Sequence, residues 1–108
     1  MTTSTTTLGQ ALIAARKKKG MSQKDLAAAV QKEDGSGSIS PQYLNDIEHD
    51  RRSPTSDHLI REFAEALGVD EDYLFVLAGK IPEDLRLTAT DPASTAKAFR
   101  AFRRSLSK

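Results

Sequence analysis

Cysteine is missing from this chain of 108 residues, and histidine occurs only twice. Without cysteine, the chain forms neither a disulfide nor a thiolate zinc site. No apolar run approaches the roughly 20 residues that a membrane-spanning helix needs. The first residues, MTTSTTT, also lack the apolar stretch of a secretory signal. We therefore expect a cytoplasmic protein without a membrane partner.

Few side chains suit acid–base or metal chemistry. His49 and His58 are the only bases that titrate near neutral pH, and neither belongs to a recognisable nucleophile pattern. His58 and Glu62 stand four positions apart, a spacing that can hold a metal, but no third ligand accompanies them. The sequence thus predicts no enzyme, no metal site and no cofactor.

Charge is nearly balanced, with 16 basic and 15 acidic residues and a net charge of +1. This balance argues against a protein that coats nucleic acid by charge alone. The charges are unevenly placed, however: residues 1–56 carry +2 (8 basic against 6 acidic), residues 57–90 carry −5 (3 against 8) and residues 91–108 carry +4 (5 against 1). Basic ends around an acidic middle would orient the protein on a polyanion.

The pattern of apolar residues predicts an all-α fold. No stretch alternates with a period of two, which argues against strands. Apolar residues recur instead with helical spacing, and cap residues delimit helices over about 8–19, 22–30, 40–50, 56–67 and 70–79, a short helical turn at 81–85 and a last helix over about 92–106.

This pattern also divides the chain. Residues 1–7 are polar and are expected to be a disordered tail, residues 8–79 a single helical domain, and residues 80–108 a helical extension. Within the domain, the apolar positions expected to face the core of the first and fifth helices are Leu8, Leu12, Ile13, Tyr73, Leu74 and Leu77.

Residues 21–52 predict two short helices that share one core. Ser22 and Ser40 are suitable N-caps, and Pro41 suits the first position of the second helix. One face of this second helix is apolar, with Tyr43, Leu44 and Ile47, and the opposite face is polar, with Pro41, Gln42, Asn45, Asp46 and His49. The polar face is therefore available to a partner.

The order of these residues resembles the Cro and phage-repressor family of helix-turn-helix regulators, also called the XRE type. The resemblance covers about residues 8–79 and implies a five-helix domain of the lambda-repressor-like type, to which this chain adds a C-terminal amphipathic helix. The matching residues, in the family's order, are Arg16, Gly20, Met21-Ser22-Gln23, Leu26-Ala27, Ile39-Ser40, Tyr43-Leu44, Ile47-Glu48, Arg51-Arg52-Ser53-Pro54, Leu59, Ala64, Leu67-Gly68-Val69 and Tyr73-Leu74.

Two departures from the family's pattern stand out. Residues 31–38, QKEDGSGS, replace a short glycine turn between the two helices and predict a flexible loop, which the fold tolerates because closure entropy grows slowly with length. Lys32, Glu33 and Asp34 in this insertion either reach DNA or a partner, or are simply solvated. Asp50 stands where the family has glycine after the recognition helix; aspartate adopts the left-handed conformation at modest cost.

The resemblance implies that the second helix, the recognition helix, enters the major groove of DNA and contacts bases through Pro41, Gln42 and Asp46, with Asn45 beside them. Gln42 is the first choice, because glutamine forms two hydrogen bonds with adenine. Asp46 is the second, since DNA repels a carboxylate unless it meets a cytosine amine or pairs with an arginine.

Other roles follow from the same resemblance. An arginine of the first helix pairs with the glutamate that ends the recognition helix, which assigns Arg16 and Glu48 to a structural ion pair. Contacts to the DNA phosphates are implied for five residues around the recognition helix, where backbone N–H groups at helix N-termini assist: Gln23, Ser40, Tyr43, Arg51 and Arg52.

The predicted C-terminal helix is amphipathic. Lys97, Arg100, Arg103 and Arg104 lie largely on one side, and Ala96, Phe99, Phe102 and Leu106 lie on the other. Two phenylalanines on a terminal helix need a partner surface. They either pack on the chain's own domain or form a twofold dimer contact through Phe99, Phe102 and Leu106; a membrane-surface role is a third interpretation.

We therefore expect a sequence-specific regulator that binds double-stranded DNA as a homodimer on an inverted repeat. A repressor that occludes a promoter is the first interpretation, and an activator whose acidic residues 70–72 contact polymerase is the second. The alternative is a protein-interaction module, such as an antitoxin or accessory factor, because a fold alone does not establish a function. A steep dependence of binding on salt distinguishes the first from the second.

Overall fold

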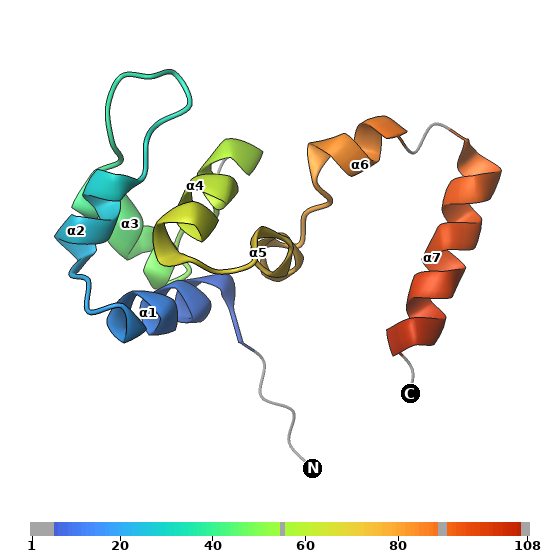
Figure 1. Ribbon diagram of the computed structural model, residues 1–108, viewed down its shortest axis with the longest axis horizontal. Helices are drawn as coiled ribbons and strands as arrows, with labels where there is room; N and C mark the ends of the chain where they lie inside the picture. Colours follow the sequence, from blue (N-terminus) through green and yellow to red (C-terminus); the bar gives the residue numbers. More distant parts are fainter. Residues whose placement is uncertain (1–5, 55, 89–90, 107–108) are drawn as a thin grey trace, which may run out of the picture.

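The computed structural model describes residues 6–54, 56–88 and 91–106. Within these residues seven helices follow one another: α1 (Leu8–Lys18), α2 (Gln23–Ala29), α3 (Pro41–Glu48), α4 (Asp57–Leu67), α5 (Glu71–Ala78), α6 (Glu83–Thr88) and α7 (Pro92–Leu106). The described residues contain no strand, only an isolated bridge between Gln31 and Ser38. The predicted all-α fold class is confirmed, and α3 is the expected recognition helix (Figure 1).

Short polar side chains fix where the helices begin. Ser22 and Ser40 cap α2 and α3 as expected, each accepting a hydrogen bond from the backbone N–H three residues further on. Thr7 caps α1 in the same way, in a reciprocal capping box with Gln10. The prediction of a disordered tail was therefore wrong for Thr7, and residues 1–5 lie outside the described part of the chain.

Left-handed residues follow four of the helices, among them Gly20 after α1, with a φ angle of 72°. Gly68 and Gly79 follow α4 and α5 with φ angles of 68° and 69°, a conformation that glycine adopts without steric cost. Asp50, which follows α3 and its C-cap, has a φ angle of 59°. Aspartate thus ends the recognition helix in the backbone conformation expected for it.

Helices α1 to α5 enclose one apolar core, with α4 against α5 and α3 against both α1 and α2. Two expected core positions were wrong: Ile13 is only half-buried, and the Tyr73 side chain is 49% exposed. Phe75 takes the place of Tyr73, because α5 turns so that Leu74 and Phe75 face inward. The buried apolar residues are Leu8, Leu12, Leu26, Ala27, Val30, Ile39, Leu44, Ile47, Leu59, Ile60, Phe63, Ala64, Leu67, Leu74 and Phe75.

The insertion at residues 31–38 forms a small hairpin-like loop. The two sides of the loop are joined by hydrogen bonds from Lys32 N to Gly37 O (2.8 Å) and, at its base, from Ile39 N to Val30 O (3.0 Å). The side chain of Asp34 accepts from the Ser36 N–H at 2.9 Å. Hydrogen bonding to Ser36, first to its side chain and then to its backbone N–H, holds the pKa of Asp34 below its usual value of 3.8. The insertion thus has a defined hydrogen-bonded form, which its glycine and serine content did not predict.

Helix α4 anchors the base of this loop. His58 Nε2 lies 2.9 Å from the carbonyl oxygen of Gln31, and Glu62 Oε1 accepts from the Gln31 N–H at 3.0 Å. The i, i+4 pair that the sequence offered as two metal ligands therefore binds both backbone groups of one residue. No group of three or more potential metal ligands occurs among the residues that the structure describes.

Helices α6 and α7 extend away from this five-helix body. Figure 1 shows α6 leading outward from α5, and α7 standing apart from α1 to α5 at the far side of the molecule. The radius of gyration is 15.8 Å, whereas a compact domain of this length has about 13 Å. The difference reflects the extension, so α7 does not pack on the five-helix body.

Candidate nucleic-acid interface

Glu48 joins the first three helices through a single buried carboxylate. Its oxygens accept hydrogen bonds from Arg16 Nε at 2.7 Å and Arg16 Nη2 at 3.1 Å on α1, and from Gln23 Nε2 at 2.8 Å on α2. Glu48 is 2% exposed. The remaining Arg16 nitrogen, Nη1, donates to the carbonyl of Met21 at 2.9 Å, just before α2. The structure thus forms the expected ion pair and uses it to fix α3 relative to α1 and α2.

Gln23 lies at the first position of α2 and bridges to α3. Besides its bond to Glu48, its Nε2 donates to Asn45 Oδ1 at 3.0 Å. At the same helix start, hydrogen bonding to Ser22, first to its backbone N–H and then to its side chain, holds the pKa of Asp25 below its usual value of 3.8. Two residues assigned to DNA contacts, Gln23 and Asn45, are therefore brought together.

Asp46 is the centre of a second polar cluster, on the exposed side of α3. Its carboxylate accepts from Gln42 Nε2 at 3.2 Å and from Arg51 Nε at 3.1 Å, and it forms an ion pair with Arg52 at 3.6 Å. The Asp46 carbonyl also accepts from the N–H groups of both arginines, at 2.8 and 3.3 Å. The charge that would repel DNA is therefore paired with two cations.

Tyr43 completes the exposed side of α3 toward the insertion. The Arg52 guanidinium lies 5.9 Å from the centre of the Tyr43 ring, within the range of a cation–π contact. Tyr43 is half-buried and packs against the core. An open cavity of about 470 Å³ lies beside it, lined by Lys32, Glu33, Asp34, Ile39, Ser40, Tyr43, Ser56 and Leu59.

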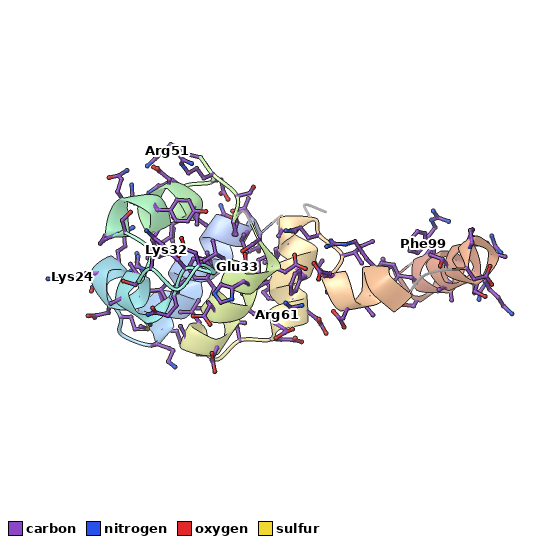
Figure 2. All side chains as sticks on the ribbon, turned by 90° about the horizontal axis from the view of Figure 1, so that it is seen from above. Lys24, Lys32, Glu33, Arg51, Arg61 and Phe99 are labelled. Carbon is purple, nitrogen blue, oxygen red and sulfur yellow. The ribbon has the colours of Figure 1, made fainter. Side chains whose placement is uncertain are left out.

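Exposed residues lie at both ends of α3, where they are accessible to a partner. Pro41 and Gln42 are exposed at the start of α3, and the Arg51 and Arg52 side chains are 55% and 61% exposed. Figure 2 shows Arg51 at one edge of this end of the molecule and Lys24, from α2, projecting from it. Lys24 is an exposed cation beside Gln23 that sequence reasoning did not single out.

The three residues assigned to dimerisation do not meet any of these groups. Phe99, Phe102 and Leu106 on α7 are 46%, 58% and 67% exposed. Figure 2 shows Phe99 on the helix at the far end of the molecule from Lys24. The structure therefore does not show α7 packed on the chain's own domain, which was one of the two main interpretations of this helix.

The arrangement defines a class of protein: an all-α helix-turn-helix domain that presents the polar face of its second motif helix. A sequence model of the helix-turn-helix family matches residues 12–74, more than half of the chain. The chain belongs to this family, of the XRE or Cro-repressor type, and is a DNA-binding regulator of that type. Searches of curated proteins and of solved structures gave no significant match.

The match spans the elements that build the candidate interface. Residues 12–74 run from the middle of α1 to α5 and include the insertion, Glu48 and the Asp46 cluster. Helices α6 and α7 lie outside it. No helix among the described residues has the length and apolar character to cross a membrane.

Proposed function

We propose that α3 enters the major groove and reads bases, with Gln42 as its principal base contact. Gln42 is exposed at the second position of α3, and its amide can form two hydrogen bonds with adenine. Pro41 and Asn45 flank it on the same helix. The bond from exposed Gln42 to half-buried Asp46 lies at the surface, so we expect it to exchange readily for a bond to a base.

Asp46 then acts first by positioning its neighbours. Its carboxylate binds Gln42, Arg51 and Arg52 at once, so it orders one base-reading side chain and two cations before DNA arrives. A direct contact of Asp46 with a cytosine amine is the second role we propose for it. The salt bridges relieve the repulsion that a lone carboxylate would meet.

Phosphate contacts surround this helix in our proposal. Arg51 and Arg52 follow α3 and clamp one strand, and the two helix starts at Gln23 and Ser40 direct backbone N–H groups to the phosphates. Tyr43 contributes its hydroxyl. These contacts hold the protein in register and carry no sequence information themselves.

The observation that carries the proposal is the pairing of an exposed reading face with a rigidly held helix. The buried Glu48 carboxylate ties α3 to α1 and α2 through three hydrogen bonds, while Gln42 stays exposed. Base readout needs such a fixed orientation, because each base edge is recognised by bonds of defined direction.

We further propose that the protein acts as a repressor, as a homodimer on an inverted repeat. Two recognition helices of such a dimer enter successive major grooves, about 34–36 Å apart. The exposed apolar residues of α7 supply a surface for association. A dimer bound in this way occludes a promoter that overlaps its site, which is the simplest way for a DNA-binding domain to repress.

Selection of bound duplexes from a random pool tests this function directly. We expect an enriched sequence with twofold symmetry, and an affinity that falls steeply as salt rises, because bound Lys and Arg release counterions from the phosphates. The matched control is Gln42→Ala. This variant keeps the charge of the protein, so its salt dependence should be unchanged while its sequence preference is relaxed. No enrichment, or a flat salt dependence, would favour the alternative function as a protein-interaction module.

A further inference from the structure

Among the described residues, exposed large apolar side chains lie around α5 and α6 and on α7. The first set, the α5 surface, consists of Tyr73 and Val76 on α5 and of Ile81 just after it, which are 49%, 69% and 47% exposed. The second, the α7 stripe, consists of Phe99, Phe102 and Leu106, whose i, i+3 and i+7 spacing places them on one face of the helix.

A helix such as α7 requires a contact to be stable. Isolated helices shorter than about 12–15 residues are marginal in water, and most helices gain their stability by packing an amphipathic face. α7 has 15 residues, and every one of them is exposed except the half-buried Thr95. The described residues of one chain therefore leave this stripe uncovered.

The charges around the two surfaces are complementary. α7 contains four basic residues and no acidic one. The segment that carries the α5 surface, residues 57–90, has a net charge of −5. Exposed Glu71, Asp72 and Glu83 lie on α5 and α6, where Glu71 and Glu83 form exposed ion pairs with Arg61 and Arg86. Pairing α7 with a second α7 would instead bring two strongly basic helices together, and like charges in close contact cost several kcal/mol.

The root of the extension is fixed, so that α7 is directed away from its own body. The Asp57 carboxylate at the start of α4 binds Lys80 Nζ at 3.1 Å, the Glu83 N–H at 2.9 Å and Arg86 Nη2 at 3.9 Å. These contacts hold the start of α6 against α4, and Figure 1 shows α6 leading outward from there to α7. The extension thus carries α7 away from its own five-helix body.

We propose that the α7 stripe of one copy docks on the α5 surface of a second copy, and that the exchange is reciprocal. Such a contact is isologous and closes as a twofold dimer, the commonest symmetry of soluble oligomers. It rests on the proposed dimeric function and specifies its interface: a basic helix from each subunit covers the acidic, apolar side of the other. The phenylalanines anchor the helix at the centre of that contact.

Cross-linking between distinguishable chains tests the docking. The chain has no cysteine, so one full-length variant carries Val76→Cys and a second, size-tagged variant carries Ala98→Cys, beside the stripe. Treatment of their mixture with a short bismaleimide should yield the mixed dimer, with far less cross-linking in either variant alone. Two results overturn the proposal: Ala98→Cys chains cross-linking to one another, and a dilute double variant cross-linking within a single chain.

A matched pair of substitutions measures the contribution of the stripe. Phe102→Ser should raise the dimer dissociation constant about tenfold or more, as for a central anchor, when measured by sedimentation without DNA. Ala101→Ser, on the opposite face of the same helix, should leave it unchanged. Equal dissociation constants for the two variants and the parent chain overturn the docking. Sequence-selective binding to a single half-site is measured separately, so its presence or loss bears on the DNA-reading function alone.

Discussion

The carboxylate of Asp50 binds the start of α1, accepting hydrogen bonds from the Thr7 hydroxyl at 2.7 Å and from the Gly9 N–H at 3.1 Å. Thr7 is itself the N-cap of α1. A negative charge at this end of a helix also interacts favourably with the helix dipole. One residue therefore ends the recognition helix and caps the first helix, which a glycine at position 50 could not do.

Substitutions at Asp50 should separate these two roles. Asp50→Ala loses the cap and keeps a left-handed backbone, so we expect a loss of about 2 kcal/mol in unfolding free energy, from about 1 kcal/mol for each effect. Asp50→Gly loses only the cap, so its unfolding free energy should lie about halfway between those of the parent chain and Asp50→Ala. Urea unfolding monitored by circular dichroism measures both. A glycine variant more stable than the parent chain would contradict the capping role.

Gly9 marks the closest approach of α1 to the end of α3. A Cβ atom at this position would lie 2.3 Å from the carbonyl oxygen of Glu48 and 2.6 Å from that of Ile47. Alanine usually stabilises a helix interior relative to glycine, by about 0.5–1 kcal/mol. Here Gly9→Ala should instead destabilise the protein by about 1–3 kcal/mol, as overpacking does, and thermal unfolding should show a lower Tm. An unchanged or higher Tm would show that the two helices separate easily.

The buried carboxylate of Glu48 should matter more for stability than any exposed ion pair. Glu48→Ala removes one partner of a buried pair and leaves Arg16 uncompensated, which costs about 3–5 kcal/mol. Glu48→Gln, the matched control, keeps the shape and part of the hydrogen bonding and should cost less. The exposed pair of Arg61 with Glu71 provides a second comparison, since its loss should cost at most about 1 kcal/mol. Chemical denaturation measures the unfolding free energy of the two Glu48 variants and of a variant that lacks the Arg61–Glu71 pair.

Local signals made much of this fold predictable. Ser22, Ser40 and Pro41 fix helix starts through bonds within one turn, so the sequence alone locates them. Gly68 and Gly79 do the same for helix ends. The Arg16 and Glu48 pair could be expected only from the family resemblance, because 32 positions separate the two residues.

The rest depends on contacts between distant residues. Tyr73 and Phe75 are both apolar enough to face the core, and only the packing of α5 on α4 decides that Phe75 is buried. The Asp46 cluster requires the chain after α3 to turn back, which brings Arg51 and Arg52 to a carboxylate one turn earlier. Likewise, the base of the insertion is held at Gln31 by His58 and Glu62 on α4, far along the sequence.

Acid should release the start of α6 from α4. Burial alone would raise the pKa of Asp57, but hydrogen bonds from Lys80 and the Glu83 N–H, with the charges of Lys80 and Arg86, outweigh it and lower the pKa below its usual 3.8. Because the folded pKa is depressed, this stabilisation is fully present above about pH 4. It is lost as the pH falls through the lowered pKa. The Glu83 amide resonance should report this transition in an NMR titration, and Asp57→Asn should abolish its pH dependence.

Specificity and affinity should respond to different residues of the interface. Gln42→Ala removes a proposed base contact without a change of charge, so it should cost about 1–3 kcal/mol on the selected site and relax the choice of base at one position. Arg51→Ala should weaken binding to all sequences nearly equally and reduce the slope of log affinity against log salt by about 1. Titration of matched and mutated duplexes at several salt concentrations distinguishes the two patterns.

The same titrations test whether Asp46 is a positioning residue. Asp46→Asn keeps a hydrogen-bonding side chain but removes the charge that holds Arg51 and Arg52. If Asp46 only positions the arginines, base preference should stay as in the parent chain, because Gln42 still reads its base. If Asp46 also contacts a cytosine amine, preference should change at one further position, since asparagine bonds adenine instead. Identical profiles for Gln42→Ala and Arg51→Ala would contradict the division of the interface into reading and anchoring residues.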